Sequence, residues 1–446
     1  MKFKDVIGVF FSLFLAFIAF ALSNIILDGN LIFSVEVGII MFYFSFIVLI
    51  YKDRFNPFLF LLISFGLGIL DIIFVAFKIR NVQNYYSIHI YEKCLFIIIL
   101  WLFGFTISYF GFGLLKNNKK SKSLKGIINN MINKSNERII LIIFLVLYIY
   151  VLYKIFITIK LLGGVQNALI NSSIFRYNNQ GYLATLLSLC SIIPICLFEL
   201  KKKKMSALSL ILMLIVLMLT GRRGLIISSL LLPFLVYYNY GYKKISNKQL
   251  IPCMLIFFVI ILFIGMLRNQ SSVTSTNNSF ISTLTNLTIS TQMGENLPDT
   301  IYSLDNGSVK YQKFKYLNRG LVGLVPRKVW NNKPDLIDHS MIVSKLVYGN
   351  DKYGRPIGSF GFSYLCFGYV GVIIISILTG IISRIFYDWM VKTKTYMSIF
   401  LYSILINYVI NIIKPESLMN VLAIVLIIIF CSFLSNLKRM LIGGKK

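Results

Sequence analysis

Arginine side chains gather where apolar segments of this 446-residue chain are interrupted or end. Arg222 and Arg223 lie in Gly221-Arg-Arg-Gly224, within a long apolar stretch, and Arg268 directly follows another. A guanidinium at such a position is costly unless it has a partner or a function. Its planar fork can donate two hydrogen bonds to one phosphate, and flanking glycines allow that phosphate or a sugar to approach the backbone. The pattern indicates anion binding, although interfacial anchoring is the alternative for each arginine.

A histidine and two aspartates form a second candidate cluster, Asp335-Leu-Ile-Asp338-His339. Histidine can accept a proton from a hydroxyl near neutral pH, and a desolvated aspartate can do the same. A solvated polar turn after Pro334 is the alternative interpretation of this cluster.

Several motifs of familiar enzymes are missing from the sequence. It contains no phosphate-binding loop of the Walker type, no dinucleotide fingerprint, no His-Glu-x-x-His and no Asp-x-Asp pair. The six cysteines lie in or beside apolar runs and show no metal-like or disulfide spacing. We therefore expect no cofactor and no metal.

The composition shows what kind of element must position these residues. Apolar residues make up 57% of the chain and charged residues 14%, against about 45–50% and about 25% in soluble domains. This excludes a soluble globular protein and predicts an all-α, polytopic protein with a single membrane domain over residues 1–446. The net charge of +29 is expected for loops that face the cytoplasm and lipid headgroups. No basic domain stands apart, so we expect no nucleic-acid partner.

Twelve apolar segments approach the roughly 20 residues that a membrane span needs. They are 6–27, 31–50, 57–77, 94–115, 139–160, 182–200, 205–221, 223–240, 249–267, 358–384, 396–413 and 417–437. Most basic residues fall on the inner side if both termini are cytoplasmic, as the positive-inside rule requires. The first segment lacks a cleavage signature, so we expect it to be retained as a helix.

One large outer loop, residues 268–357, separates the ninth and tenth segments. Loops of this length are usually functional or disordered, and its aromatic content argues against disorder. We expect short amphipathic helices on the outer membrane face. The loop contains Arg319, Arg327 and Arg355, and a shorter outer segment contains Arg176. Directly after the loop, the glycine spacing from Gly358 to Gly371 predicts a small-residue stripe for close helix packing.

These motifs, in this order, resemble the bacterial O-antigen and capsule polymerase family and, more distantly, the O-antigen ligases. Gly221-Arg222-Arg223-Gly224 is similar to the family's Ser-Arg-Gly-type motif, with Arg222 at the usual serine position, and Phe367-Gly-Tyr-Val-Gly371 resembles the helix after the large loop. The resemblance implies a GT-C-like glycosyltransferase with a large periplasmic loop. It also implies that Arg223 faces phosphate, with Arg268 or Arg319 as further candidates.

The resemblance implies transfer of a glycan from undecaprenyl pyrophosphate to a sugar hydroxyl of another lipid-linked repeat unit, at the outer face of the bacterial inner membrane. Arginines would stabilise the pyrophosphate leaving group without a metal, and His339 or Asp338 would be the general base. The expected partners are the lipid-linked oligosaccharide, membrane lipid and a chain-length regulator protein. An O-antigen ligase and a lipid-linked oligosaccharide flippase are the alternatives, although a flippase should lack so long an outer loop.

Overall fold

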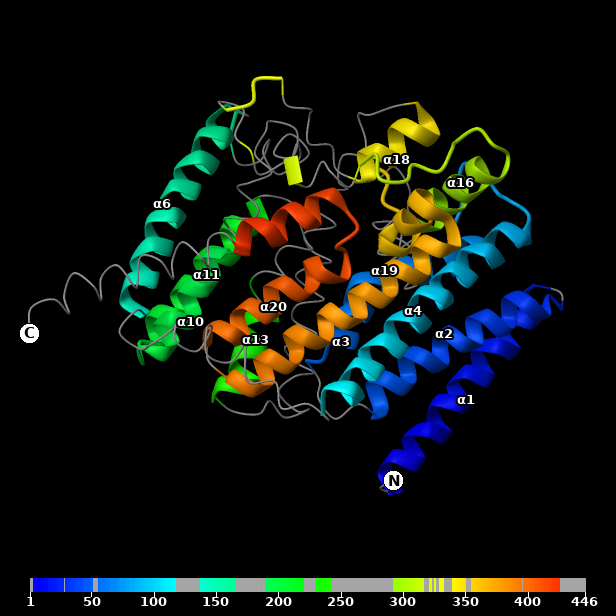
Figure 1. Ribbon diagram of the computed structural model, residues 1–446, viewed down its shortest axis with the longest axis horizontal. Helices are drawn as coiled ribbons and strands as arrows, with labels where there is room; N and C mark the ends of the chain where they lie inside the picture. Colours follow the sequence, from blue (N-terminus) through cyan, green and yellow to red (C-terminus); the bar gives the residue numbers. More distant parts are fainter. Residues whose placement is uncertain are drawn as a thin grey trace, which may run out of the picture. The chain divides into compact units, whose positions relative to one another are not determined.

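The computed structural model is helical wherever it describes regular structure (Figure 1). It describes residues 3–27, 29–50, 55–117, 137–161, 163–164, 186, 189–219, 230, 232–242, 292–316, 321–322, 325, 329–332, 339–349, 354–394 and 396–425. The chain divides into two compact units. The first comprises Met1–Lys119, Asn277–Tyr387 and Ile406–Leu422, and the second comprises Lys120–Thr276, Asp388–Leu405 and Ala423–Lys446.

The helices of the first unit are α1 (Phe3–Ile26), α2 (Leu31–Ile50), α3 (Pro57–Ala76), α4 (Ile88–Asn117), α16 (Met293–Asp305), α18 (His339–Tyr348) and α19 (Gly358–Thr393), whose end passes into the second unit. A further helix, Pro415–Val425, begins in the first unit. The second unit contains α6 (Glu137–Leu161), α10 (Ile192–Glu199), α11 (Lys203–Leu219), α13 (Leu232–Tyr237), a π-helix (Tyr238–Tyr242) and most of α20 (Tyr396–Ile410).

Four helices in the described part are long and apolar enough to cross a membrane: Gly8–Ile26, Ile88–Leu114, Leu141–Leu161 and Gly358–Thr393. Leu31–Ile47, Ser64–Ala76, Ser398–Ile410 and Pro415–Val425 are shorter apolar helices. The chain is thus a multi-pass membrane protein. The count of twelve spans stays a prediction, because segments such as 249–267 lie outside the described residues.

Local sequence explains where α3 begins. The Asn56 side chain accepts hydrogen bonds from the backbone N–H groups of Phe58 and Leu59, at 2.8 and 3.2 Å. Pro57 occupies the first helical position, where its missing N–H costs nothing. A defined start for α3 matters because its other end contributes Asp71 to the candidate site.

Small residues allow α4 and α19 to pack closely. A Cβ atom added to Gly104 would lie 2.1 Å from Ser376 Oγ, and one added to Gly380 would lie 2.1 Å from Ser108 Oγ. Between α3, α4 and α19 the core is aromatic, since the Phe65 ring lies 5.7 Å from Trp101 and 5.1 Å from Phe360. This packing in the first unit fixes the helices that support the large loop.

The glycine-rich start of α19 differs from the predicted stripe. Gly361 does pack closely, because an added Cβ would lie 2.7 Å from Leu297 of α16. Gly368 instead adopts φ 63° and ψ −151° and kinks the helix. At this kink the backbone N–H groups of Gln312 and Lys313 donate to the carbonyls of Leu365 and Cys366, at 3.0 and 2.8 Å. Gly368 is therefore needed for its backbone conformation and not for helix packing.

In the second unit, α10 is joined to α11 and α13 by side-chain hydrogen bonds. The Ser206 hydroxyl donates to the Pro194 carbonyl at 2.7 Å, and the Tyr237 hydroxyl donates to Glu199 at 2.7 Å. Helix α10 begins only at Ile192, so it covers the second half of the predicted segment 182–200.

Candidate functional site

The N-terminus of α16 is fixed on α3. The Gly294 backbone N–H donates to Asp71 Oδ2 at 2.7 Å, and both groups are buried. A Cβ atom on Gly294 would lie 2.5 Å from the Asp71 carbonyl oxygen, so only glycine allows this approach. The first helical turn of the loop is thereby fixed to an apolar helix of the first unit.

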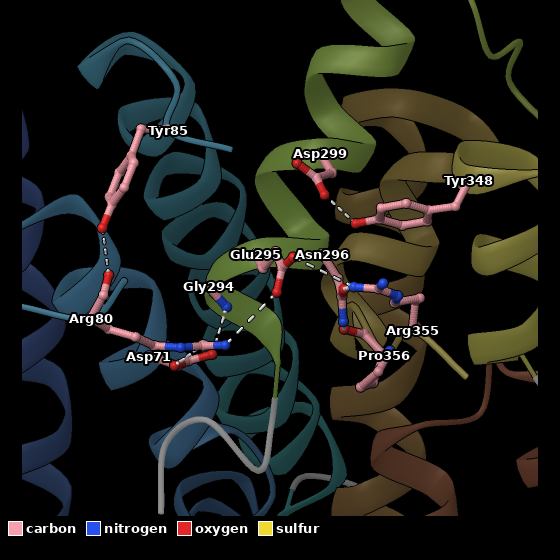
Figure 2. Close-up of polar contacts among 10 residues, drawn as sticks. All are labelled: Asp71, Arg80, Tyr85, Gly294, Glu295, Asn296, Asp299, Tyr348, Arg355 and Pro356. Atoms are coloured by element: carbon pink, nitrogen blue, oxygen red, sulfur yellow. Dashed lines mark hydrogen bonds and ion pairs between the residues drawn. The ribbon is translucent and has the colours of Figure 1, made fainter. Parts of the chain in front are cut away.

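Four charged side chains extend from this contact in alternating sign (Figure 2). Asp71 forms a buried ion pair with Arg80, whose side chain is 6% exposed. Arg80 Nη2 lies 3.9 Å from Glu295 Oε2, and Glu295 Oε1 lies 3.6 Å from Arg355 Nη1. Because two acidic and two basic side chains alternate, the net charge of this series is zero, as a buried ionic network requires.

Arg355, one of the predicted anion-binding residues, is the last of these four charged side chains. Its guanidinium lies over the Tyr348 ring, 4.3 Å from the ring centre, and Nη1 donates to Asn296 Oδ1 at 3.3 Å. Asn296 also donates to the Pro356 carbonyl at 3.2 Å. These contacts fix the guanidinium plane while a quarter of the side chain stays exposed. An oriented, partly exposed guanidinium is suited to bind an anion.

A buried aspartate joins the neighbouring segments. Asp299 of α16 accepts hydrogen bonds from the hydroxyl of Tyr86, at 2.6 Å, and from that of Tyr348. Burial raises the pKa of the Tyr86 phenol well above its usual value, and the hydrogen bond to Asp299 adds to this effect. The pKa of Tyr348 is raised in the same way and for the same causes. Both phenols therefore remain protonated donors at neutral pH.

The backbone brings Arg355 next to His339. The Arg355 N–H donates to the Ser340 carbonyl at 2.8 Å. A Cβ on Gly354 would lie 2.5 Å from Ser340 Oγ, so this contact is close. The backbone of Arg355 thus lies beside the start of α18, whereas its guanidinium lies over Tyr348, the last residue of that helix.

His339 is held by a residue that the sequence did not indicate. Its Nδ1 contacts Glu416 Oε1, and its backbone N–H donates to Glu416 Oε2 at 3.2 Å. The Phe362 ring of α19 meets the imidazole edge to face, with centroids 5.9 Å apart. A carboxylate beside Nδ1 favours the proton on that nitrogen. Nε2, which is buried in this structure, is then the ring nitrogen that can accept a proton.

The comparison with protein families shows to which family the chain belongs. The model of the family O-antigen polysaccharide polymerase Wzy matches residues 8–440. The chain belongs to this family. Comparisons with curated proteins and with solved structures gave no match.

The other residues predicted for a Wzy-family site are not placed. Arg176, Arg222, Arg223, Arg268, Arg319, Arg327 and Asp338 lie outside the described residues. Their roles stay predictions. Among the described residues, no three His, Cys, Asp or Glu side chains are grouped as a metal site would need.

Sequence reasoning missed Glu416, Glu295 and Asn296 and did not pair Asp71 with Arg80. An acid inside an apolar helix needs a partner, and Asp71 was noticeable for that reason. Arg80 is the nearest basic residue after Asp71 other than Lys78, so this one pair could have been proposed. No comparable signal marks Glu416, because its partner is 77 residues away in the chain.

Proposed function

We propose that this Wzy-family polymerase transfers an undecaprenyl-pyrophosphate-linked glycan to the sugar hydroxyl of another lipid-linked repeat unit. The reaction takes place at the outer face of the bacterial inner membrane, with both termini of the chain in the cytoplasm. The family match over residues 8–440 carries the proposal. The oriented guanidinium of Arg355 and the His339 imidazole paired with Glu416 support it.

The leaving group determines what the site must supply. Pyrophosphate leaves readily once its charge is stabilised, and arginines can do this without a metal. Among the residues that the structure describes, Arg355 is the candidate for binding pyrophosphate. Its polar contacts to Glu295 and Asn296 both use Nη1. Arg223, with Arg222, Arg268, Arg319, Arg176 and Arg327, completes the proposed set of anion-binding residues.

The acceptor hydroxyl needs a base. His339 fills this role in the proposal, because its Nδ1 is engaged by Glu416 and its imidazole Nε2 can take a proton. Asp338 is the second candidate. Proton removal by His339 makes the acceptor oxygen a better nucleophile at the anomeric carbon of the donor.

The first test is a gel of surface glycolipid from the host with this gene deleted. Core lipid carrying one repeat unit, with the ladder of longer chains gone, supports the polymerase. Bare core without any repeat would instead indicate a ligase or a flippase. An unchanged ladder would contradict the proposed function in this host.

The role of Arg355 is tested by a pair of variants. Arg355→Ala should lower polymerisation by about 100-fold, the usual loss for one charge-stabilising donor. It also leaves Glu295 with one basic neighbour, Arg80, in place of two, and so adds an excess negative charge. The double variant Arg355→Ala with Glu295→Gln removes that excess charge. If the double variant recovers both thermal stability and polymer length, Arg355 is structural and its proposed contact with pyrophosphate is wrong.

Lys310→Ala is the matched control, because Lys310 is an exposed basic residue of the same loop. It should leave polymer length and thermal stability unchanged. A loss equal to that of Arg355→Ala would mean that general positive charge in the loop, and not this oriented guanidinium, is what matters.

A further inference from the structure

We propose that Glu416 is the positioning residue for His339. Its carboxylate holds the imidazole in one orientation and favours the tautomer whose Nε2 can accept the proton of the acceptor hydroxyl. The inference rests on the proposed function, in which His339 is the base. It adds a residue that follows α19 in the sequence and lies 77 positions after His339.

The geometry differs from that of an ordinary histidine–carboxylate pair. One oxygen of Glu416 contacts Nδ1 of the ring, and the other accepts the backbone N–H of the same residue. Because one rigid carboxylate holds both ring and backbone, rotation of the side chain is restricted. The Phe362 ring limits the imidazole from a third direction, and the His339 side chain is only 10% exposed.

The chain contains a second histidine–glutamate pair for comparison. His89 Nδ1 lies 2.8 Å from Glu92 Oε2 one turn along α4, but the His89 side chain is 79% exposed. That pair has one ring contact and open solvent around the imidazole. The Glu92 side chain is only 10% exposed, but solvent around His89 weakens the pairing. The buried imidazole of His339 and the two-point contact of Glu416 are what suit this pair to a positioning role.

A purely structural role for Glu416 must also be considered. His339 is the first residue of α18, and a carboxylate that accepts a helix N-terminal N–H stabilises that helix. A capping role predicts loss of stability when Glu416 is changed. It does not predict a change in the pH dependence of the rate, so the two roles can be separated.

The step that His339 carries out is a simple displacement. The acceptor hydroxyl gives its proton to Nε2 while its oxygen forms a bond to the anomeric carbon. The bond from that carbon to the pyrophosphate oxygen breaks, and its electron pair leaves with undecaprenyl pyrophosphate. The proton then passes from Nε2 to solvent. Glu416 touches no reacting atom and acts by stabilising the imidazolium that forms.

Other charged groups near His339 also bear on its protonation. Glu416 and Lys414 come from the turn and helix around Pro415, Lys345 lies on α18 itself, and Arg355 joins Ser340 through the backbone. Of these, Glu416 contacts Nδ1 of the imidazole ring. Removing its charge disfavours the imidazolium.

The experiment measures kcat, KM and the pH–rate profile of the full-length protein in detergent. The substrate is the lipid-linked repeat unit that accumulates in the deletion host. Glu416→Gln is nearly isosteric and can still accept from Nδ1. It should lower kcat by about 10–100-fold, the range found when the hydrogen-bond partners of metal-bound histidines are removed. KM should stay within about twofold, and the acid limb of the profile should move to lower pH. Glu92→Gln is the matched control and should change none of these.

Each outcome tests a different statement. A loss of thermal stability in Glu416→Gln with an unmoved pH profile would show a helix cap only and overturn the positioning role. Wild-type kcat in both Glu416→Gln and Glu416→Ala would overturn it as well. Wild-type kcat in His339→Ala would instead remove the base from the proposed function, while the polymerase activity itself stands. Absence of polymer from the wild-type protein would contradict the proposed function as a whole.

Discussion

At the scale of single residues, the ion pair of Asp71 with Arg80 is the most deeply buried charge contact of the candidate site. Asp71 is fully buried, and its carboxylate also accepts the Gly294 N–H. Removing one member of such a pair leaves the other charge uncompensated in a medium of low dielectric. The Asp71 carboxylate therefore both neutralises Arg80 and holds α16 of the loop on α3, so its loss should cost much stability.

Asp71→Asn should destabilise the protein by about 3–5 kcal/mol, because Arg80 loses its closest carboxylate. Thermal unfolding in detergent, followed by intrinsic fluorescence, measures the change. Asp305→Asn is the control, since Asp305 pairs with Lys93 at 2.5 Å but is 36% exposed, and it should cost below about 1 kcal/mol. Equal losses in the two variants would show that burial does not set the value of the Asp71 pair.

The sequence indicated some residues of this candidate site but not the contacts that join them. His339 and Arg355 were identified because their side chains suit proton and anion chemistry. Glu416 and Glu295 were not, because an ordinary acid gains its role from a contact that only the folded chain makes. The nearness of Arg355 to Ser340 likewise depends on a backbone hydrogen bond that no residue type announces.

At the scale of elements, α16 is the part of the loop that organises the others. The sequence predicted amphipathic helices on the outer membrane face, but α16 packs on α3 and α4 of its own unit and is largely buried. The apolar segments located most helices well, because a long apolar run favours one helix. Their ends were less predictable. Helix α4 begins at Ile88, six residues before the predicted segment, because polar residues continue the helix.

Gly294→Ala should separate α16 from α3. The added methyl would lie 2.5 Å from the Asp71 carbonyl oxygen and 2.7 Å from Val75 Cγ2. Overpacking of this kind costs about 1–3 kcal/mol, and polymer length should fall because Glu295 moves with the helix. Gly111→Ala is the control, since no atom lies within 4 Å of its added Cβ. Both variants are compared by thermal unfolding and by the glycolipid gel, and a tolerated Gly294→Ala would contradict the close contact.

The two phenols on Asp299 give a defined pH response to the contacts of α16 with α18 and with the segment between α3 and α4. Their pKa values are raised in the folded protein, so this stabilisation is complete below the unfolded tyrosine value of about 10. It is lost as the pH rises above that value toward the folded ones. Thermal stability measured from pH 8 to 11 should decline at the alkaline end. The decline should be smaller in the double variant Tyr86→Phe with Tyr348→Phe, and an equal decline would show that other groups cause it.

At the scale of the whole molecule, the direction of the chain across the membrane decides on which face the candidate site works. The placement of the loop outside rests on the distribution of basic residues. Helix lengths and hydropathy cannot supply this direction, because a helix can cross the membrane either way. The direction thus stays a prediction that needs its own test.

Single cysteines test it directly. In a variant without the six native cysteines, Lys310→Cys lies in the loop and Lys202→Cys lies between α10 and α11, and both positions are exposed. A membrane-impermeant maleimide applied to spheroplasts should label the first and not the second. After permeabilisation both should react. Labelling of Lys202→Cys in sealed spheroplasts would reverse the predicted topology.

The order of the four charges along the chain has a consequence for synthesis. Asp71 and Arg80 are nine residues apart, whereas Gly294 follows Asp71 by 223 residues. At roughly 5–20 residues per second, the ribosome needs about 10–45 s to reach it. During that time Asp71 can be neutralised by Arg80 alone. Glu295 and Arg355 then emerge in the same acid-then-base order. At every stage of synthesis, therefore, this series contains at most one charge whose counterpart has not yet been made.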